Sequence, residues 1–429
     1  MIRFAAPCLA LLLASSPLAA DEGEITGSPR TAVEFLKPAL SLEGGKWFDG
    51  QRFLEDNWYS VDGKLTRTRP ARIDVRIDLD GRYILPPLAD AHNHNLQNAW
   101  TATTFADAYL RRGIFYSAQL AANAEEIAGY RGLLGGPGRV DVLWAEATLS
   151  SSDGHPLGLA LAGAKQAGMP ANPEDYVDKA FWAIDSLADL DAKWPRIAET
   201  RPQLIKVIVV DDAHWSAQRE DPSSYGFRGM STALLPEVVR RAHAIGARVA
   251  AHVDSADDID RVVASGVDIV AHLNTRIPKG LTATDLRLSD TTITEMKRRG
   301  TKIIPTVAVT RYYLAAHPED RAGLLAVIRD NLTRLKAAGV PMLAGSDLFD
   351  GSVIDEIEAL HATDVFSPAE LLALATSVTP KALFPDRQIG NFAEGAEASL
   401  VAYDADPSKE LAILREPRFA IKQGEILAR

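Results

Sequence analysis

The chain is poor in cysteine, in positive charge and in long apolar runs. It has one cysteine in 429 residues, and because a disulfide framework or a cysteine-based zinc site needs at least two thiols, both are excluded. No run approaches the roughly 20 apolar residues that a membrane-spanning helix needs, so stable membrane insertion is not expected. Lysine and arginine number 46 against 57 aspartates and glutamates, a net charge of −11. Such an acidic chain repels phosphate backbones, and we expect no nucleic-acid partner.

Residues 1–20 have the pattern of a secretory signal peptide. Arg3 supplies a positive start, residues 4–14 are almost wholly apolar, and small residues precede an expected cut near Ala20. The alternative is a helix buried in the fold, which two prolines in this stretch oppose. The sequence therefore predicts a periplasmic or secreted protein, and its mature form would have lost Cys8 and would contain no thiol.

Residues 83–384 alternate between short apolar runs and segments with helical periodicity. Continuous apolar strands that alternate with amphipathic helices are typical of a parallel sheet covered by helices. Together with a strand that ends near His92, the runs give about eight units, which predicts an α/β fold, a (β/α)8 TIM barrel. The runs lie at residues 114–120, 140–149, 204–210, 249–253, 267–273, 303–309 and 340–345.

The two ends of the mature chain have a different pattern. Residues 21–82 contain Asp-Gly pairs that are typical of turns between strands, and residues 385–429 contain two further strand-like stretches, at 400–403 and 421–426. We expect both ends to come together as one small β-sandwich domain beside the barrel.

Two histidines stand two positions apart where a predicted strand ends. Residues 90–94 read Asp-Ala-His-Asn-His, and because alternate residues of a strand point to one side, His92 and His94 can hold one ion together. A motif this short also arises by chance, so the other strand ends matter. Lys206 lies inside an apolar strand, where an unpaired ammonium is costly. Three more candidates each end an apolar strand: His252, His272 and Asp347. Active sites of such barrels lie at the carboxyl ends of the strands, so we predict a metal-binding site there.

These segments, in this order, resemble the amidohydrolase superfamily of metal-dependent hydrolases, in the branch of imidazolonepropionase-like enzymes and Xaa-Pro or Xaa-Arg dipeptidases. The resemblance covers nearly the whole mature chain. Its first segment is similar to the family's Pro-Gly-hydrophobic-hydrophobic-Asp-x-His-x-His stretch, with Pro87 where the family has glycine. The matching segments are residues 85–94, 204–207, 242–252, 264–272, 345–347 and 390–407.

The resemblance implies a role for each candidate ligand. His92, His94 and Asp347 would bind one divalent metal ion, and His252 and His272 would bind a second. Zinc is the expected metal, since imidazole and carboxylate suit it, with manganese, cobalt or iron as alternatives.

The resemblance also implies a chemical modification and a reaction. A lysine ammonium has no lone pair, so Lys206 would react with CO₂ to form a carbamate whose two oxygens bridge the metals. A water between the metals would attack the scissile carbonyl. Asp347 would take the proton of that water and pass it to the leaving amine.

Substrate contacts are suggested by residues in the barrel loops. The family has a Gly-His-Gly-like loop after the third strand, where His155 lies and would polarise the substrate carbonyl. The family's tyrosine before the strand-5 helix falls on Met230, and Tyr225 nearby would take its place. Further candidates, each of which could equally be an ordinary loop residue, are Trp100, Arg228, Arg311 and Tyr312. No role is assigned to His214, His243, His317 and His361.

Three functions fit these patterns. The first is an exported metal-dependent amidohydrolase that cleaves an amide or peptide C–N bond in an N-acyl amino acid, a dipeptide or a similar small molecule. The second is a mononuclear deaminase, or a cyclic-amide or lactone hydrolase, of the same superfamily; residues 252–255 lack the glutamate that adenosine-type and cytosine-type deaminases place near the strand-5 histidine. The third is a non-catalytic binding protein, which would be expected to have lost a ligand. The sequence leaves the substrate, the number of metals and homo-oligomerisation open.

Overall fold

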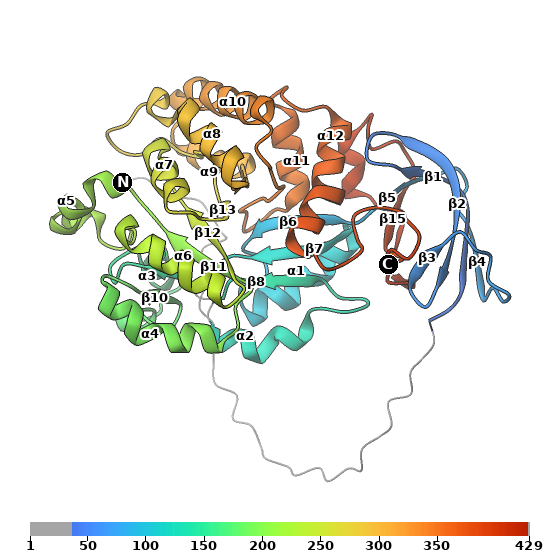
Figure 1. Cartoon of the computed structure of the whole chain (residues 1–429), viewed down its shortest axis with the longest axis horizontal. Helices are drawn as coiled ribbons and strands as arrows, with labels where there is room; N and C mark the ends of the chain where they lie inside the picture. The colour runs from blue at the N-terminus through green and yellow to red at the C-terminus, as the bar shows by residue number, and fades with distance from the viewer. Residues whose placement is uncertain (1–36, 123, 147, 428–429) are drawn as a thin grey trace, which may run out of the picture.

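The computed structural model describes residues 37–427 apart from 123 and 147. The expected signal peptide and Cys8 lie outside the described residues. Figure 1 shows a barrel wrapped by helices, with a sheet of mostly antiparallel strands packed against one side of it. Among the described residues, none of the helices combines the length and the apolarity that crossing a bilayer requires.

The barrel is a closed ring of parallel strands with eight strand positions around it. The third position is shared by two consecutive strands, β8 and β9. The eighth is residues 342–345: Met342 pairs with Ile303 on one side, and the Ala344 carbonyl accepts a 2.8 Å hydrogen bond from the Ala91 N–H on the other. The paired strands are, in order, β6 (Leu88–Asn93), β7 (Ile114–Gln119), β8 (Asp141–Trp144), β9 (Thr148–Ser150), β11 (Leu204–Ile208), β12 (Arg248–His252), β13 (Ile269–Val270) and β14 (Lys302–Ile303), and β10 (Phe181–Ala183) pairs with β9 on its other side.

Helices connect the strands and cover the outside of the barrel (Figure 1). Polar N-cap residues determine where several of these helices begin. In α7, for example, the Ser255 hydroxyl accepts a 3.1 Å hydrogen bond from the Asp258 N–H, so the helix begins soon after the strand that ends at His252. The helices are α1 (Ala99–Arg111), α2 (Ala124–Tyr130), α3 (Leu157–Gln166), α4 (Leu187–Glu199), α5 (Trp215–Glu220), α6 (Leu235–Ala244), α7 (Ala256–Ala264), α8 (Asp290–Arg299), α9 (Thr310–Ala316), α10 (Arg321–Ala338), α11 (Val353–His361), α12 (Pro368–Ala373) and α13 (Thr379–Leu383).

The second domain is β-rich and is built from both ends of the described chain. Residues 395–398 join its far edges, since the Leu65 N–H donates to the Ala396 carbonyl at 2.7 Å and the Gly424 N–H to the Ala398 carbonyl at 2.9 Å. One sheet thus surrounds a separate apolar core that contains Trp47. Its strands, in spatial order, are β17 (Glu425–Leu427), β16 (Phe419–Lys422), β15 (Leu400–Tyr403), β5 (Tyr83–Leu85), β1 (Leu40–Phe48), β2 (Phe53–Val61) and β3 (Lys64–Thr66), with β4 (Val75–Asp78) also paired to β1.

The architecture confirms the predicted α/β class, with a (β/α)8 barrel and a β-domain from both chain ends. The parallel barrel matters for function because it directs the carboxyl ends of all its strands to one face. Lys206 is buried in the middle of β11, opposite Ala250 of β12. Its side chain lines the same cavity as the residues at the carboxyl ends of the strands.

Candidate active site

The predicted metal ligands meet at the carboxyl ends of the barrel strands. His92 lies in β6 and His94 directly after it, and the Asp347 N–H donates to the His92 carbonyl at 2.6 Å. This hydrogen bond joins the eighth barrel position to the first. Asp347 has φ of 54°, a left-handed conformation that is uncommon for residues other than glycine. Backbone strain of this kind is typical of functional sites, where surrounding contacts hold it in place.

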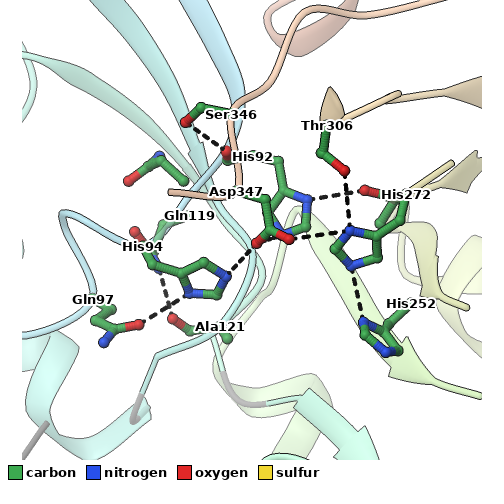
Figure 2. A network of polar contacts seen from close by, with 12 residues as sticks. His92, His94, Gln97, Gln119, Ala121, His252, His272, Thr306, Ser346 and Asp347 are labelled. Carbon is green, nitrogen blue, oxygen red and sulfur yellow. Dashed lines mark hydrogen bonds and ion pairs between the residues drawn. The ribbon is translucent and has the colours of Figure 1, made fainter. Parts of the chain in front are cut away.

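The Asp347 carboxylate is surrounded by three imidazole rings, as Figure 2 shows. Its Oδ1 lies 3.1 Å from His92 Nε2 and 2.9 Å from His94 Nε2. Its Oδ2 lies 3.1 Å from His272 Nδ1. His92, His272 and Asp347 therefore offer nitrogen and oxygen atoms close enough together to hold one metal ion.

A second pair of nitrogen atoms converges beside the first group. His252 Nδ1 lies 2.9 Å from His272 Nε2, and the two rings meet edge to face with centroids 4.6 Å apart (Figure 2). Two neutral nitrogens that both present lone pairs would repel at this distance, so the contact requires a shared proton or a cation. The His155 ring stacks on His252, with centroids 5.0 Å apart and planes 17° from parallel.

Contacts outside the cluster fix two of the rings. His92 Nδ1 lies 3.0 Å from the Ala271 carbonyl, which can only accept, so Nδ1 carries the proton and Nε2 presents its lone pair to the centre. His94 Nδ1 lies 3.1 Å from Gln97 Oε1, and the Phe349 ring stacks on the imidazole with centroids 4.7 Å apart. Both rings are thereby turned with Nε2 towards Asp347.

Burial favours the neutral histidines that metal binding requires. Desolvation lowers the pKa of His272 to about 4 and holds the pKa of His92 well below its usual value. Desolvation raises the pKa of the Asp347 carboxyl, but the neighbouring His92 and His272 outweigh it and hold that pKa well below its usual range. At neutral pH the cluster therefore combines neutral imidazoles at His92 and His272 with an ionised carboxylate at Asp347.

Lys206 supplies a buried amine to the same group. Its side chain is 3% exposed, and desolvation lowers its pKa to about 8, although the nearby Asp347 acts in the opposite direction. An amine with this pKa is partly neutral near pH 7 and can act as a nucleophile.

One cavity of about 730 Å³ contains all of these side chains. The six predicted ligands and His155 line it, and much of the remaining wall is apolar. That wall is formed by Leu120, Ala121, Ala122, Pro156, Leu159, Ala160, Met169, Pro170, Tyr176, Ala180, Ile208, Val309 and Phe349.

The other predicted substrate contacts do not reach this cavity. Tyr225 is 45% exposed and is not among the lining residues, and Met230 is fully buried in the barrel core. Arg228 is buried in an ion pair with Asp153. Trp100, Arg311 and Tyr312 do not line the cavity, and the last two bind Asp350 instead.

Two groups of residues near the site were not predicted from the sequence. Asp175, Tyr176 and Lys179 line the cavity from the connection between α3 and β10. The long stretch between the third and fourth strands was the available signal for this insertion. Asp254 was also missed, although it stands only two positions after His252.

Known proteins resemble this chain in sequence and in fold. The model of the amidohydrolase family matches residues 83–427. An uncharacterised protein of Mycobacterium tuberculosis and one of Mycobacterium bovis are each 29% identical over 209 residues, which is 44% of this chain. The chain spans about half the length of these curated relatives.

Several solved structures share the fold at low identity. A prolidase complexed with N-methylphosphonate-L-proline has a TM-score of 0.69 at 21% identity, with 91% of this chain and 100% of that chain covered. A putative prolidase from Bifidobacterium longum has a TM-score of 0.68 at 20% identity, with 92% and 95% covered. The A. niger ochratoxinase has a TM-score of 0.70 at 19% identity, with 91% and 96% covered. At such identities these similarities show the fold alone. The family model, however, matches most of the sequence, and the chain belongs to the amidohydrolase family.

Proposed function

We propose that the protein is an exported, metal-dependent amidohydrolase that cleaves the amide or peptide C–N bond of a small molecule, such as an N-acyl amino acid or a dipeptide. The observation that carries the proposal is the convergence of four histidines, Asp347 and Lys206 in one cavity of about 730 Å³. Membership of the amidohydrolase family supports it. So do the prolidase and the ochratoxinase among the similar folds. Export rests on the signal-peptide pattern of residues 1–20.

The donor set supplies ligands for two divalent cations. His92, His94 and Asp347 would hold one ion and His252 with His272 the other, with zinc as the expected metal. His272 faces both groups: its Nδ1 lies 3.1 Å from Asp347 Oδ2, and its Nε2, 2.9 Å from His252 Nδ1, would bind the second ion. A carbamate on Lys206 would bridge them and would also remove the cost of burying its ammonium. Metals bound here would act as Lewis acids towards a carbonyl group and towards water.

The chain's own side chains can perform the proton transfers. Asp347 is an ionised carboxylate that lines the cavity, so it can accept a proton from the attacking water and deliver it to the leaving nitrogen. His155 lines the cavity, and desolvation holds its pKa well below the usual value, so its neutral ring can donate one N–H to the substrate carbonyl oxygen. The apolar wall would exclude water from the reaction.

Metal content tests the proposal and separates its alternatives. The purified protein should contain about two metal ions per chain, and removing them with a chelator should abolish hydrolysis until zinc, manganese or cobalt is added back. One ion per chain would favour the mononuclear deaminase or the cyclic-amide or lactone hydrolase. No metal would favour the binding protein. The assay should include N-acyl amino acids, Xaa-Pro and Xaa-Arg dipeptides, lactones and aminated heterocycles; inactivity of the metal-loaded protein on every amide would contradict the proposed reaction.

Lys179 offers a contact for a substrate carboxylate. It and Lys206 are the two cationic side chains among the described lining residues, and within the described ranges no carboxylate pairs with Lys179. We expect Lys179→Met to raise KM for an N-acyl amino acid about fivefold, the effect of losing about 1 kcal/mol of ion pairing. KM for the matching neutral amide should not change. Lys165→Met, an exposed lysine at the end of α3 outside the lining, is the control; equal effects on both substrates would exclude carboxylate recognition by Lys179.

A further inference from the structure

We propose that Asp254 and Arg276 form a positioning pair that fixes the His252 ring for metal binding. The inference rests on the metal centre of the proposed function and adds two residues that neither contact the reacting atoms nor match a ligand position. It assigns them to one half of the centre, the half formed by His252 and His272.

The Asp254 carboxylate lies beside both His252 and Arg276. Asp254 lies between β12 and α7, is 6% exposed, and places its Oδ1 3.5 Å from His252 Nε2. Arg276 approaches the same carboxylate with two nitrogens: its Nε donates to Oδ1 at 3.2 Å and its Nη2 donates to Oδ2. This fork geometry gives an arginine–carboxylate pair a defined orientation.

The opposite nitrogen of His252 faces the metal site. His252 Nδ1 lies 2.9 Å from His272 Nε2, on the side away from Asp254. A neutral imidazole carries one N–H and one lone pair. A carboxylate beside Nε2 favours the proton there, which leaves the Nδ1 lone pair for a metal. Stacking of His155 on the ring limits rotation that would exchange the two nitrogens.

Arg276 balances the negative charge of the buried Asp254 carboxylate. A buried carboxylate without a counter-charge is strongly unfavourable, and a guanidinium keeps its positive charge at any ordinary pH. The pair therefore presents a buried carboxylate to His252 with most of its negative charge balanced. Arg276 itself does not line the cavity, so its direct partner is the carboxylate and not a substrate.

Metal titration of the full-length mature enzyme tests this assignment. We expect Asp254→Ala to weaken binding of one of the two metal ions about 10-fold to 100-fold, the usual cost of losing an outer partner of a metal-binding histidine. The other ion should bind as in the wild type. Asp254→Asn keeps an oxygen that can accept from Nε2–H, so it should recover part of the affinity. Zinc affinity is measured by competition with a chelating dye, and the absorption of the cobalt-substituted protein reports the geometry of each site.

A matched control and a second variant keep the outcome clear. Asp257→Ala removes an exposed aspartate of α7 that pairs with Arg261, and it should leave both affinities unchanged. If Asp254→Ala does not fold, Arg276→Met decides, with the same weakening of one metal expected. Wild-type affinity for both ions in Asp254→Ala, or in Arg276→Met, would overturn the positioning role alone. A wild-type protein that never binds two ions would instead overturn the proposed function.

Discussion

Asp347→Asn is expected to lower kcat/KM by about 10³-fold or more while the protein stays folded. General acid–base catalysis alone contributes about 10²–10⁴-fold. The amide is nearly the same shape as the carboxylate but carries no charge and cannot accept the proton of an attacking water. It would also weaken the contact with the three imidazoles, which now lie 2.9–3.1 Å from the two carboxylate oxygens. Steady-state kinetics on the best substrate of the panel measures the loss.

Two controls separate loss of chemistry from loss of structure. Asp386→Asn changes an exposed aspartate outside the cavity and should leave both rate and stability unchanged. His92→Ala removes a ligand without touching the proposed proton carrier, and it should abolish hydrolysis together with one metal. Thermal unfolding should remain cooperative in all three variants. Activity within tenfold of the wild type in Asp347→Asn would exclude the proposed role of this carboxylate.

The convergence of the candidate metal ligands could be predicted because of a property of parallel barrels. Each candidate ends an apolar strand, and the carboxyl ends of all barrel strands share one face. Sequence position alone was therefore enough to predict that His92 and Asp347, at opposite ends of the barrel sequence, would lie together. The hydrogen bond from the Asp347 N–H to the His92 carbonyl joins the last barrel strand to the first and brings these two residues together.

The loop contacts could not be predicted in the same way. Tyr225 lies close to the expected position in sequence, but its side chain is exposed because the path of a loop depends on its packing partners. Arg228 has a charge suited to a substrate carboxylate, yet it is buried against Asp153, a partner far away in sequence. No local sequence pattern predicts an ion pair between residues so far apart in the chain.

The third strand shows a limit of apolar periodicity. Residues 140–149 form one apolar run, but the structure divides them into β8 and β9. Glu146 between them has φ of 55°, a conformation that a continuous strand does not allow. β8 pairs with β7, whereas β9 pairs with β10 and β11. The third strand position is therefore divided: β8 pairs with the second strand, and β9 pairs with the fourth.

Lys206→Ala is expected to lower hydrolysis at least about 100-fold, because it removes the proposed bridging carbamate. The structure explains why this lysine is suited to react with CO₂. With a pKa of about 8, about one-tenth of the amine is neutral at pH 7, against about 0.03% at the ordinary pKa of 10.5. Only the neutral amine is nucleophilic, so carbamate formation in the metal-free protein should increase as the pH rises towards 8 and then level off.

Carbon-13 NMR and chemical rescue test this modification directly. Protein equilibrated with ¹³C-bicarbonate should show a carbamate carbon signal in the wild type and none in Lys206→Ala. A small carboxylic acid such as acetate or propionate carries two oxygens on one carbon, as the carbamate does, and could occupy the space left by the missing side chain. We expect it to restore part of the activity and of the metal content of Lys206→Ala, but not of Lys206→Met, whose side chain fills that space. Absence of the carbamate signal from an active, two-metal wild type would show that Lys206 acts as an unmodified amine, and the bridge between the metals would then have to come from another ligand.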